Sequence, residues 1–309
     1  MKNNNPLIFG PVNSRRFGIS LGIDLSPDFK QCNFDCLYCE LKKGKTVSKQ
    51  SKSLQVDDYI DATKKALMVY PETQVITITA NGEPTLYPYL NELVDRLNEI
   101  KQNKKLLILS NGGLINDVKI AQILKKIDIV KLSLDCATKE CFKKLDRLDD
   151  SINYQDIIDG IISFSKIYQK ELIIEVLFVD SLNNKQHEID KIYEILKAIN
   201  PTRVDIGTID RPPAYDVKPI SFEELQAIAY RFEGLNISIA HRNRIKLNKN
   251  LSSKEILNLL NKRPQTVDDI DNLLDDSSKK LFNELLKDNK IITKNQAGVI
   301  FYAKRWEYK

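Results

Sequence analysis

Short apolar runs alternate with longer amphipathic segments from residue 19 to about residue 240. The runs are rich in β-branched residues, which is typical of buried strands in a parallel sheet. They predict strands at 19–25, 75–80, 105–110, 128–135, 172–179 and 203–209. Successive β-α units indicate an α/β fold with helices outside a parallel sheet. Because six units are fewer than the eight of a closed barrel, we expect an open, partial (βα)6 barrel of the TIM type.

The segments between these strands carry apolar residues three and four positions apart, which predicts amphipathic helices. One predicted face consists of Leu90, Leu93, Val94, Leu97 and Ile100. A second consists of Ile157, Ile158, Ile161, Ile162 and Ser165, and a third, less regular one of Val118, Ile120, Ile123, Leu124 and Ile127. The helices should place these faces against the sheet.

The last part of the chain has a different pattern. It predicts helices at 252–263, 266–276 and 277–290, then two β runs within 291–303 around a turn containing Asn295 and Gly298. Ser252 or Ser253 and Thr266 are suitable N-caps for the first two helices, and Pro264 lies beyond the first. Three helices followed by a hairpin resemble a winged-helix domain. We therefore expect a core at 1–240, a basic, polar linker at 241–251 and a small winged-helix-like domain at 252–309.

Composition narrows the class of protein only a little. Hydrophobic residues make up 42% and charged residues 29% of the 309-residue chain, which fits a globular protein with a substantial core. No apolar run reaches the roughly 18 residues that span a bilayer, and the N-terminus lacks a secretory pattern. We expect a cytoplasmic protein without membrane contact. The net charge of +5 fits a mildly basic, solvated surface better than a nucleic-acid footprint.

Three cysteines lie close together in the sequence QCNFDCLYCEL, at Cys32, Cys36 and Cys39. A structural zinc site needs four protein ligands, and no second cysteine pair lies nearby. Thiolates are the usual ligands of iron–sulfur clusters. Three of them leave one iron of a 4Fe–4S cluster open, so we favour a cluster over zinc. Cys136 and Cys141 stand apart, and we expect buried thiols there rather than a disulfide framework.

Polar residues follow each predicted strand at the end where barrel enzymes place their active sites. The cysteine loop follows the first strand. The residues that follow the later strands are Asn81, Gly82 and Glu83, then Ser110 and Asn111, then Ser133 and Asp135, then Asn183, and finally Arg211. A carboxylate and backbone carbonyls suit a ligand's ammonium group, and Gly82 permits close backbone approach.

The C-x3-C-x2-C motif with Tyr38 before its last cysteine resembles the signature of the radical S-adenosylmethionine superfamily. The segment from Asn81 to Pro84 resembles that superfamily's Gly-Gly-Glu-Pro segment, with Asn81 in place of the first glycine. The resemblance implies a 4Fe–4S cluster whose open iron binds S-adenosylmethionine, and an electron donor such as flavodoxin or ferredoxin. It also implies a set of residues that place the cosubstrate. These are Tyr38, Asn81, Gly82, Glu83, Ser110, Asn111, Ser133 and Asp135.

Residues 9–27, together with ANGEPT and TIDRPP, resemble the wyosine-synthase-like branch of this superfamily, and the resemblance covers about residues 6–240. Wyosine synthases carry further N-terminal cysteines for a second cluster, and here no cysteine precedes Cys32. We therefore expect one cluster and do not assign their particular tRNA reaction. Arginines can hold phosphate or carboxylate groups. The candidate substrate residues are Arg15, Arg16, Asn183 and Arg211.

The function predicted from these motifs is reductive cleavage of S-adenosylmethionine and abstraction of a hydrogen atom from a substrate. The basic segment 241–250 makes RNA, with tRNA first, the leading substrate. A peptide or a small metabolite is the second possibility. An alternative of another class is a non-catalytic, zinc-stabilised winged-helix protein that binds nucleic acid.

Overall fold

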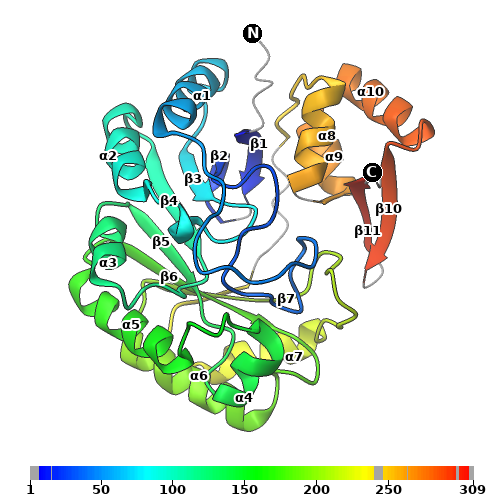
Figure 1. The fold of residues 1–309 in the computed structure, drawn as a ribbon. Coiled ribbons are helices and arrows are strands. Elements are labelled where there is room, and N and C mark those ends of the chain that lie inside the picture. The colour runs from blue at the N-terminus through cyan, green and yellow to red at the C-terminus, as the bar shows by residue number, and fades with distance from the viewer. Residues whose placement is uncertain (1–6, 15, 240–245, 263, 297–298, 306–309) are drawn as a thin grey trace.

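The computed structural model describes residues 7–14, 16–239, 246–262, 264–296 and 299–305. Arg15 and Gly298, both singled out above, lie outside these residues. The main sheet has eight strands that follow one another in chain order (Figure 1). They are β1 (Ile8–Ser14), β2 (Gly18–Asp24), β3 (Val75–Thr79), β4 (Lys105–Ser110), β5 (Ile129–Ser133), β6 (Glu171–Phe178), β7 (Arg203–Thr208) and β8 (Ile237–Ile239).

The six predicted strands are confirmed as β2 to β7, and each pairs in parallel with the next. Two further strands extend the edges: β1 pairs antiparallel with β2, and β8 pairs in parallel with β7. β1 was not predicted, because Gly10 and Pro11 interrupt its alternation of apolar and polar residues. In the structure, the register of its pairing with β2 shifts between Phe9 and Val12. Proline is tolerated at such an edge. No pairing joins β8 to β1 within the described residues, so the barrel is open as expected.

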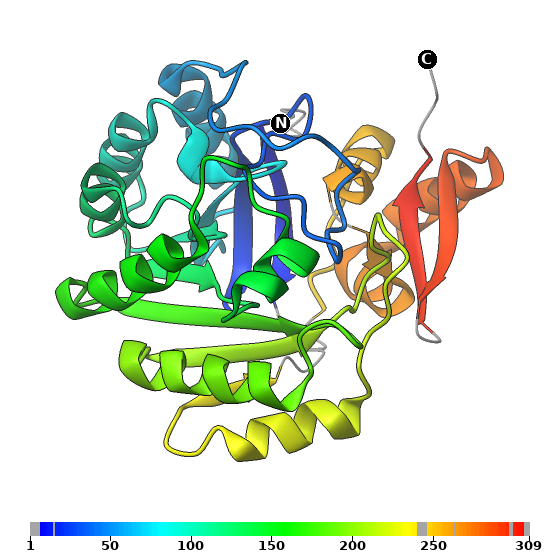
Figure 2. The same cartoon turned by 60° about the horizontal axis from the view of Figure 1, so that its bottom comes forward.

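Helices cover the outer face of the sheet (Figures 1 and 2). They are α1 (Val56–Val69), α2 (Leu90–Ile100), α3 (Val118–Leu124), α4 (Lys139–Cys141), α5 (Tyr154–Ile167), α6 (Gln186–Ile199) and α7 (Phe222–Arg231). Two short turns, η1 (Pro84–Leu86) and η2 (Phe142–Asp146), follow β3 and α4. The predicted apolar faces are confirmed in α2 and α5, whose Leu93, Leu97 and Ile161 are fully buried.

Alternation along the strands divides the apolar side chains into two sets. Residues such as Ile76, Ile108 and Val130 belong to the large core under the helices. Their sequence neighbours, which point the other way, form a separate small cluster inside the barrel. It consists of Val75, Leu107, Ile129 and Ile173, with Phe17 packed against it. Phe17 lies just before β2, so the turn between β1 and β2 helps to close the lower end of the barrel.

The C-terminal part contains the three predicted helices and the hairpin. Its elements are α8 (Ser253–Lys262), β9 (Gln265–Thr266), α9 (Val267–Leu273), α10 (Asp276–Lys287), β10 (Ile291–Gln296) and β11 (Val299–Lys304). The Ser252 hydroxyl accepts a hydrogen bond from the Glu255 amide, and the Thr266 hydroxyl accepts one from the Asp269 amide. Both predicted caps are thus confirmed. The three strands pair in the order β10-β11-β9, and winged-helix membership stays a prediction.

Residues 246–251, expected to be linker, pack on this C-terminal unit. The Leu247 amide donates to the Asn272 carbonyl at 2.6 Å, and Leu251 is buried in the unit's own apolar cluster. Val12 of β1 packs against the same cluster, and Lys249 pairs with Glu72. The unit therefore lies beside the β1 edge of the sheet, as Figure 2 shows.

No helix among the described residues is long and apolar enough to cross a membrane.

The separate cluster predicts that the C-terminal unit can lose stability independently of the barrel. Ile256 of α8 is completely buried in it, so Ile256→Ala should cost about 2–5 kcal/mol, and the milder Ile256→Val about 0.5–1.5 kcal/mol. Hydrogen exchange should accelerate in α8, α9 and α10 and stay unchanged in β3 to β6. Equal acceleration in both regions would show that the two parts unfold as one.

Candidate functional site

The three clustered cysteines lie on the long loop between β2 and α1, at the carboxyl ends of the parallel strands. All three are free and half-buried. The Cys39 amide donates to the Cys36 carbonyl at 3.1 Å, and the Phe34 amide donates to the Cys32 sulfur at 3.4 Å. Hydrogen bonds within the loop thus help to fix the positions of its cysteines.

A short backbone pairing fixes the start of this loop to the segment after β3. The Gln31 amide donates to the Asn81 carbonyl, and the Glu83 amide donates to the Gln31 carbonyl, both at 2.9 Å. Gly82 lies between these bonds with φ of 142°. A Cβ atom at Gly82 would lie 1.9 Å from the Gln31 carbonyl oxygen. Close approach was predicted at Gly82, and the structure shows that the approaching group is the cysteine loop itself.

Glu83 was expected to face the cosubstrate, but its carboxylate is buried and fully engaged within the protein. It accepts hydrogen bonds from the Thr85 amide and hydroxyl, the Ser110 hydroxyl and the Asn111 amide, at 2.7–3.0 Å. Burial raises the pKa of Glu83, although these donors oppose that effect. Glu83 and Ser110 therefore join the ends of β3 and β4 and do not point into an open site.

Asn111 connects the end of β4 to the cysteine loop. Its side-chain amide donates to Asn33 Oδ1 at 2.8 Å and approaches the Cys32 sulfur at 3.7 Å. Asn33 is completely buried, and its Nδ2 has no hydrogen-bond partner in the described structure. An unused donor therefore lies one residue from Cys32, where it suits an acceptor such as sulfide.

The side chains of Asp135 and Asn183 also form hydrogen bonds with other groups of the protein. The Asp135 carboxylate accepts from the Tyr38 hydroxyl and from the Leu177 amide. The Asn183 side chain accepts from the Val179 amide and donates to the Asp135 and Leu177 carbonyls. Asn183 is 0% exposed, so its side chain contacts the protein interior here, and its substrate role stays a prediction. Both residues hold the loops after β5 and β6, and Asp135 fixes Tyr38.

Burial dominates the electrostatics around the cysteines. It raises the pKa of Cys32 to about 12 and also raises the pKa values of Cys36 and Cys39. Burial alone would lower the pKa of Lys30. The neighbouring acidic groups, Cys39 and Cys32 first among them, together raise it above its ordinary value. The Lys30 side chain is 8% exposed and pairs with Asp35 at 3.5 Å. Metal binding must therefore displace protons from these thiols. The Lys30 ammonium group lies next to them while this occurs.

Cys136 and Cys141 are buried as expected, but they are joined by a disulfide rather than free. Cys136 follows β5 and Cys141 ends α4, which places their Cα atoms 5.4 Å apart, within the usual range for a disulfide. Helical spacing alone did not show this proximity, because the chain turns between β5 and α4. The neighbouring η2 turn packs on the cysteine loop, since the Leu37 amide donates to the Leu145 carbonyl at 2.9 Å.

The donor set suits an iron–sulfur cluster better than a single zinc ion. Within the described chain, only Cys136, Cys141 and Glu188 place three atoms of ligand type within 4.8 Å of one another, and the disulfide occupies both of those sulfurs. The sulfurs of Cys32, Cys36 and Cys39 are spread more widely. Thiolates around one tetrahedral zinc at 2.3 Å would lie about 3.8 Å apart, whereas a cluster separates its ligands further. The three loop cysteines are thus the residues that fit a 4Fe–4S cluster.

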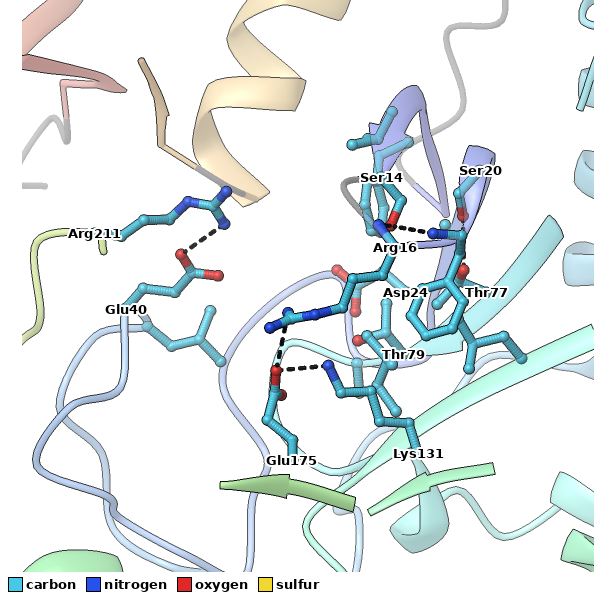
Figure 3. Close-up of a pocket in the computed structure, with 18 of the residues that line it drawn as sticks. Ser14, Arg16, Ser20, Asp24, Glu40, Thr77, Thr79, Lys131, Glu175 and Arg211 are labelled. Atoms are coloured by element: carbon cyan, nitrogen blue, oxygen red, sulfur yellow. Dashed lines mark hydrogen bonds and ion pairs between the residues drawn. The ribbon is translucent and has the colours of Figure 1, made fainter. Parts of the chain in front are cut away.

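A cavity of about 460 Å3 occupies the inside of the barrel (Figure 3). Tyr38, Cys39 and Asn81 line it on the side of the cysteine loop, and Arg211 lies at its rim, paired with Glu40 at 3.5 Å. The other predicted cosubstrate residues, Gly82, Glu83, Ser110, Asn111, Ser133 and Asp135, are not part of the lining. Of the predicted substrate residues, Arg16 and Arg211 reach the cavity.

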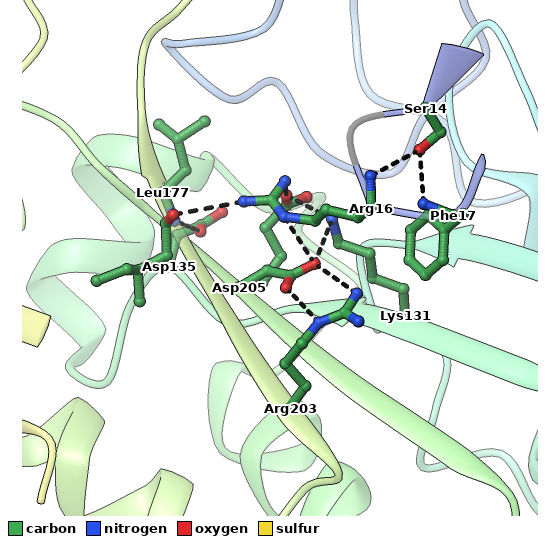
Figure 4. A network of polar contacts seen from close by, with 10 residues as sticks. Ser14, Arg16, Phe17, Lys131, Asp135, Leu177, Arg203 and Asp205 are labelled. Atoms are coloured by element: carbon green, nitrogen blue, oxygen red, sulfur yellow. Dashed lines mark hydrogen bonds and ion pairs between the residues drawn. The ribbon is translucent and has the colours of Figure 1, made fainter. Parts of the chain in front are cut away.

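A charged layer that the sequence interpretation missed lies inside the barrel (Figure 4). Asp205 is completely buried and contacts Arg203, Arg16 and Lys131 at 2.7–3.3 Å. Glu175 contacts Lys131 at 2.5 Å and Arg16 at 3.5 Å. The signal was present in the sequence: Lys131, Glu175 and Asp205 each interrupt an apolar strand at an inward-facing position.

Comparisons with known proteins agree with this architecture. A family model described as the radical SAM superfamily matches residues 27–194. A UPF0026 protein of Helicobacter pylori strain J99 is 41% identical over 98% of this chain and 99% of its own length. A UPF0026 protein of Methanocaldococcus jannaschii is 28% identical over 96% of both chains. The crystal structure of a radical SAM methyltransferase from Sphaerobacter thermophilus matches with a TM-score of 0.55 at 15% identity, over 71% of this chain and 66% of that one, which shows a shared fold.

The contact at Gly82 predicts that even a methyl group there displaces the cysteine loop. Gly82→Ala should lose most bound iron after reconstitution, because the new Cβ would collide with the Gln31 backbone and the φ angle is unfavourable for alanine. Gly207→Ala is the matched control, since a Cβ atom at Gly207 would have nothing within 4 Å. Iron and sulfide analysis compares the two variants. Full iron content in Gly82→Ala would contradict the conclusion that the contact between Gly82 and the Gln31 backbone positions the cysteine loop.

The buried Asp135 carboxylate predicts a pH-dependent contribution to stability. Burial raises its pKa to about 7, well above the ordinary value near 4. The folded state therefore favours the protonated form, and stability is lost as the pH rises from about 4 through 7. Relative to the native protein, Asp135→Asn should become more stable with rising pH, as urea denaturation at pH 5 and pH 8 would measure.

Asp149→Asn provides a control without a pH trend. Hydrogen bonds from Ser151 lower the pKa of Asp149, so its contribution to stability changes only below about pH 4. The stability difference between Asp149→Asn and the native protein should therefore be the same at pH 5 and pH 8, and a rise like that of Asp135→Asn would contradict the interpretation of Asp135.

Proposed function

The chain belongs to the radical SAM superfamily, and we propose that Cys32, Cys36 and Cys39 hold one 4Fe–4S cluster for reductive cleavage of S-adenosylmethionine. Membership of the superfamily makes the chain an enzyme and supports both cofactors. The observation that carries the residue assignment is the loop of three free cysteines, held at the strand ends beside a cavity inside the barrel. When bound, these cofactors supply an organic radical that removes a hydrogen atom from the substrate.

The chain's own residues then divide into two groups. Gly82, Glu83 and Asp135 hold the cysteine loop in place through backbone pairing and buried hydrogen bonds. Tyr38 and Asn81 line the cavity next to Cys39 and are proposed to contact the cosubstrate. Placement of the site inside the barrel limits its contact with bulk water, which would protect a reactive carbon radical from side reactions.

The cavity's size supports a small substrate. About 460 Å3 lies within the range of small-molecule sites, whereas a nucleic-acid duplex would not enter. The RNA prediction would require a single nucleotide to be extruded into the barrel, and a peptide would have to insert one side chain. We therefore place a small metabolite first, ahead of RNA. The wyosine-synthase-like branch stays a prediction from the sequence motifs.

The reaction requires a reductant as well as a substrate. A flavodoxin or a ferredoxin remains the proposed electron donor.

Anaerobic reconstitution followed by electron paramagnetic resonance tests the proposal. The reduced protein should show a 4Fe–4S signal that changes when S-adenosylmethionine is added, and it should release 5′-deoxyadenosine slowly. Replacing Cys32, Cys36 or Cys39 individually with alanine should abolish the signal change and lower 5′-deoxyadenosine release by at least about 100-fold, since cluster ligation needs each thiolate. The double variant Cys136→Ser, Cys141→Ser is the matched cysteine control and should retain both properties.

Metal analysis of the same preparations separates the enzyme from the non-catalytic alternative. Iron and sulfide in about equal amounts are expected for a 4Fe–4S cluster. Stoichiometric zinc without iron and sulfide would overturn the assignment and favour a zinc-stabilised nucleic-acid-binding protein.

A further inference from the structure

The charged layer inside the barrel is not needed to hold the cysteine loop. Its members come from the turn before β2 and from β5, β6 and β7, and their side chains point toward one another inside the barrel (Figures 3 and 4). Arg16, Lys131 and Glu175 line the cavity directly. These three side chains can therefore contact what enters the cavity.

The layer carries more positive than negative charge. Arg16, Lys131 and Arg203 provide three cations, whereas Glu175 and Asp205 provide two carboxylates. Asp205 is 0% exposed at the centre of the three cations. Arg203 binds it through both Nε and Nη2, at 2.7 and 3.4 Å. Arg16 and Lys131 share the remaining contacts of Asp205 and the single carboxylate of Glu175.

The three residues that face the cavity differ in exposure. The side chains of Arg16 and Lys131 are 13% and 8% exposed, and that of Glu175 is 36% exposed. The cations are therefore fixed and partly desolvated, while the carboxylate between them is the accessible partner. Arg16 is held further by Nη2, which donates to the Ile206 carbonyl at 3.4 Å. Its backbone amide donates to the Ser14 hydroxyl at 3.3 Å.

Apolar side chains surround this charge. Phe17 lies beneath it, with its ring centroid 6.0 Å from Lys131 Nζ and 5.3 Å from Arg203 Cζ. Leu107 and Leu177 belong to the cavity wall. Charge-assisted hydrogen bonds are stronger in such a poorly solvated place than at the surface. The rest of the lining carries Arg211 together with Asp24, Glu40 and Asp210. An anion is therefore favoured only at the Arg16–Lys131 pair.

We propose that Arg16 and Lys131 bind the anionic group of a small-molecule substrate, a carboxylate or a phosphate, which takes the place of the Glu175 carboxylate between them. The proposal rests on the proposed function, because it names the substrate class of that enzyme's cavity. Glu175 acts as an internal counter-ion that balances the cations before the substrate arrives. Arg203 and Asp205 support the two binding cations from below and do not touch the ligand.

Titration calorimetry on the full-length, anaerobically reconstituted protein tests this site. The probes are inorganic phosphate and acetate, at constant ionic strength in chloride, with neutral acetamide as the uncharged comparison. At least one anion should bind with one-to-one stoichiometry, and acetamide should not. The anion that binds identifies the substrate group as phosphate or carboxylate.

Three variants give opposite expectations. Arg16→Gln and Lys131→Met should weaken anion binding by about tenfold or more, the scale of one charge-assisted hydrogen bond. Glu175→Gln should strengthen it by about tenfold, because it removes the competing carboxylate. Lys126→Gln is the matched control outside the barrel, where Lys126 pairs with Asp95 at 2.7 Å on the surface, and it should leave binding unchanged. If Lys131→Met fails to fold, Arg16→Gln and Glu175→Gln still decide the question.

The same preparations distinguish failure of this inference from failure of the proposed function. If neither anion binds the native protein or Glu175→Gln, or if Arg16→Gln binds as the native protein does, the anion site is refuted. Release of 5′-deoxyadenosine in those samples would leave the radical chemistry standing. Intact, variant-sensitive anion binding without iron or 5′-deoxyadenosine would support the site and refute the proposed function instead.

Discussion

The close packing of the Gln31 backbone on Gly82 holds the cysteine loop against the sheet, and the arrangement of the site depends on it. Two backbone hydrogen bonds at 2.9 Å cross this contact. They set the start of the loop at the ends of β2 and β3, so Cys32 comes within reach of Asn111 from β4. Any side chain at position 82 would separate these elements. The position of the cysteine sulfurs thus depends on Gly82, which has no side chain and lets the loop pack against the segment after β3.

Buried carboxylates complete the attachment of the loop. Glu83 ties β3 to β4, Asp135 ties Tyr38 to β6, and Asp146 lies near Cys36. Burial raises the pKa values of all three. Burying a carboxylate costs free energy of solvation, but the hydrogen bonds that it accepts fix the geometry more closely than apolar contacts would. Rigidity around the cysteines follows from these contacts.

The sequence predicted the six central strands, the open barrel and the three-cysteine loop, because periodicity and spacing report directly on them. It did not predict β1, since Gly10 and Pro11 interrupt the pattern and only the edge position makes the strand tolerable. It placed Glu83, Asp135 and Asn183 at strand ends correctly but assigned them outward roles. Whether such a side chain meets a ligand or a neighbouring amide depends on the distance between adjacent loops, which a linear pattern does not contain. The partner of Cys136 was missed for the same reason.

The turn between β1 and β2 supplies both Phe17, which closes the lower end of the barrel, and Arg16, which rises into the cavity. The cysteine loop enters from the opposite ends of the same strands. In the proposed assignment, cofactor chemistry and ligand choice are carried by separate segments that the sheet joins. Substitutions in one short turn, with compensating changes at Lys131 or Glu175, can alter what the barrel accepts while the cysteines remain in place. An ancestral scaffold of this kind can acquire new substrates without rebuilding its radical chemistry.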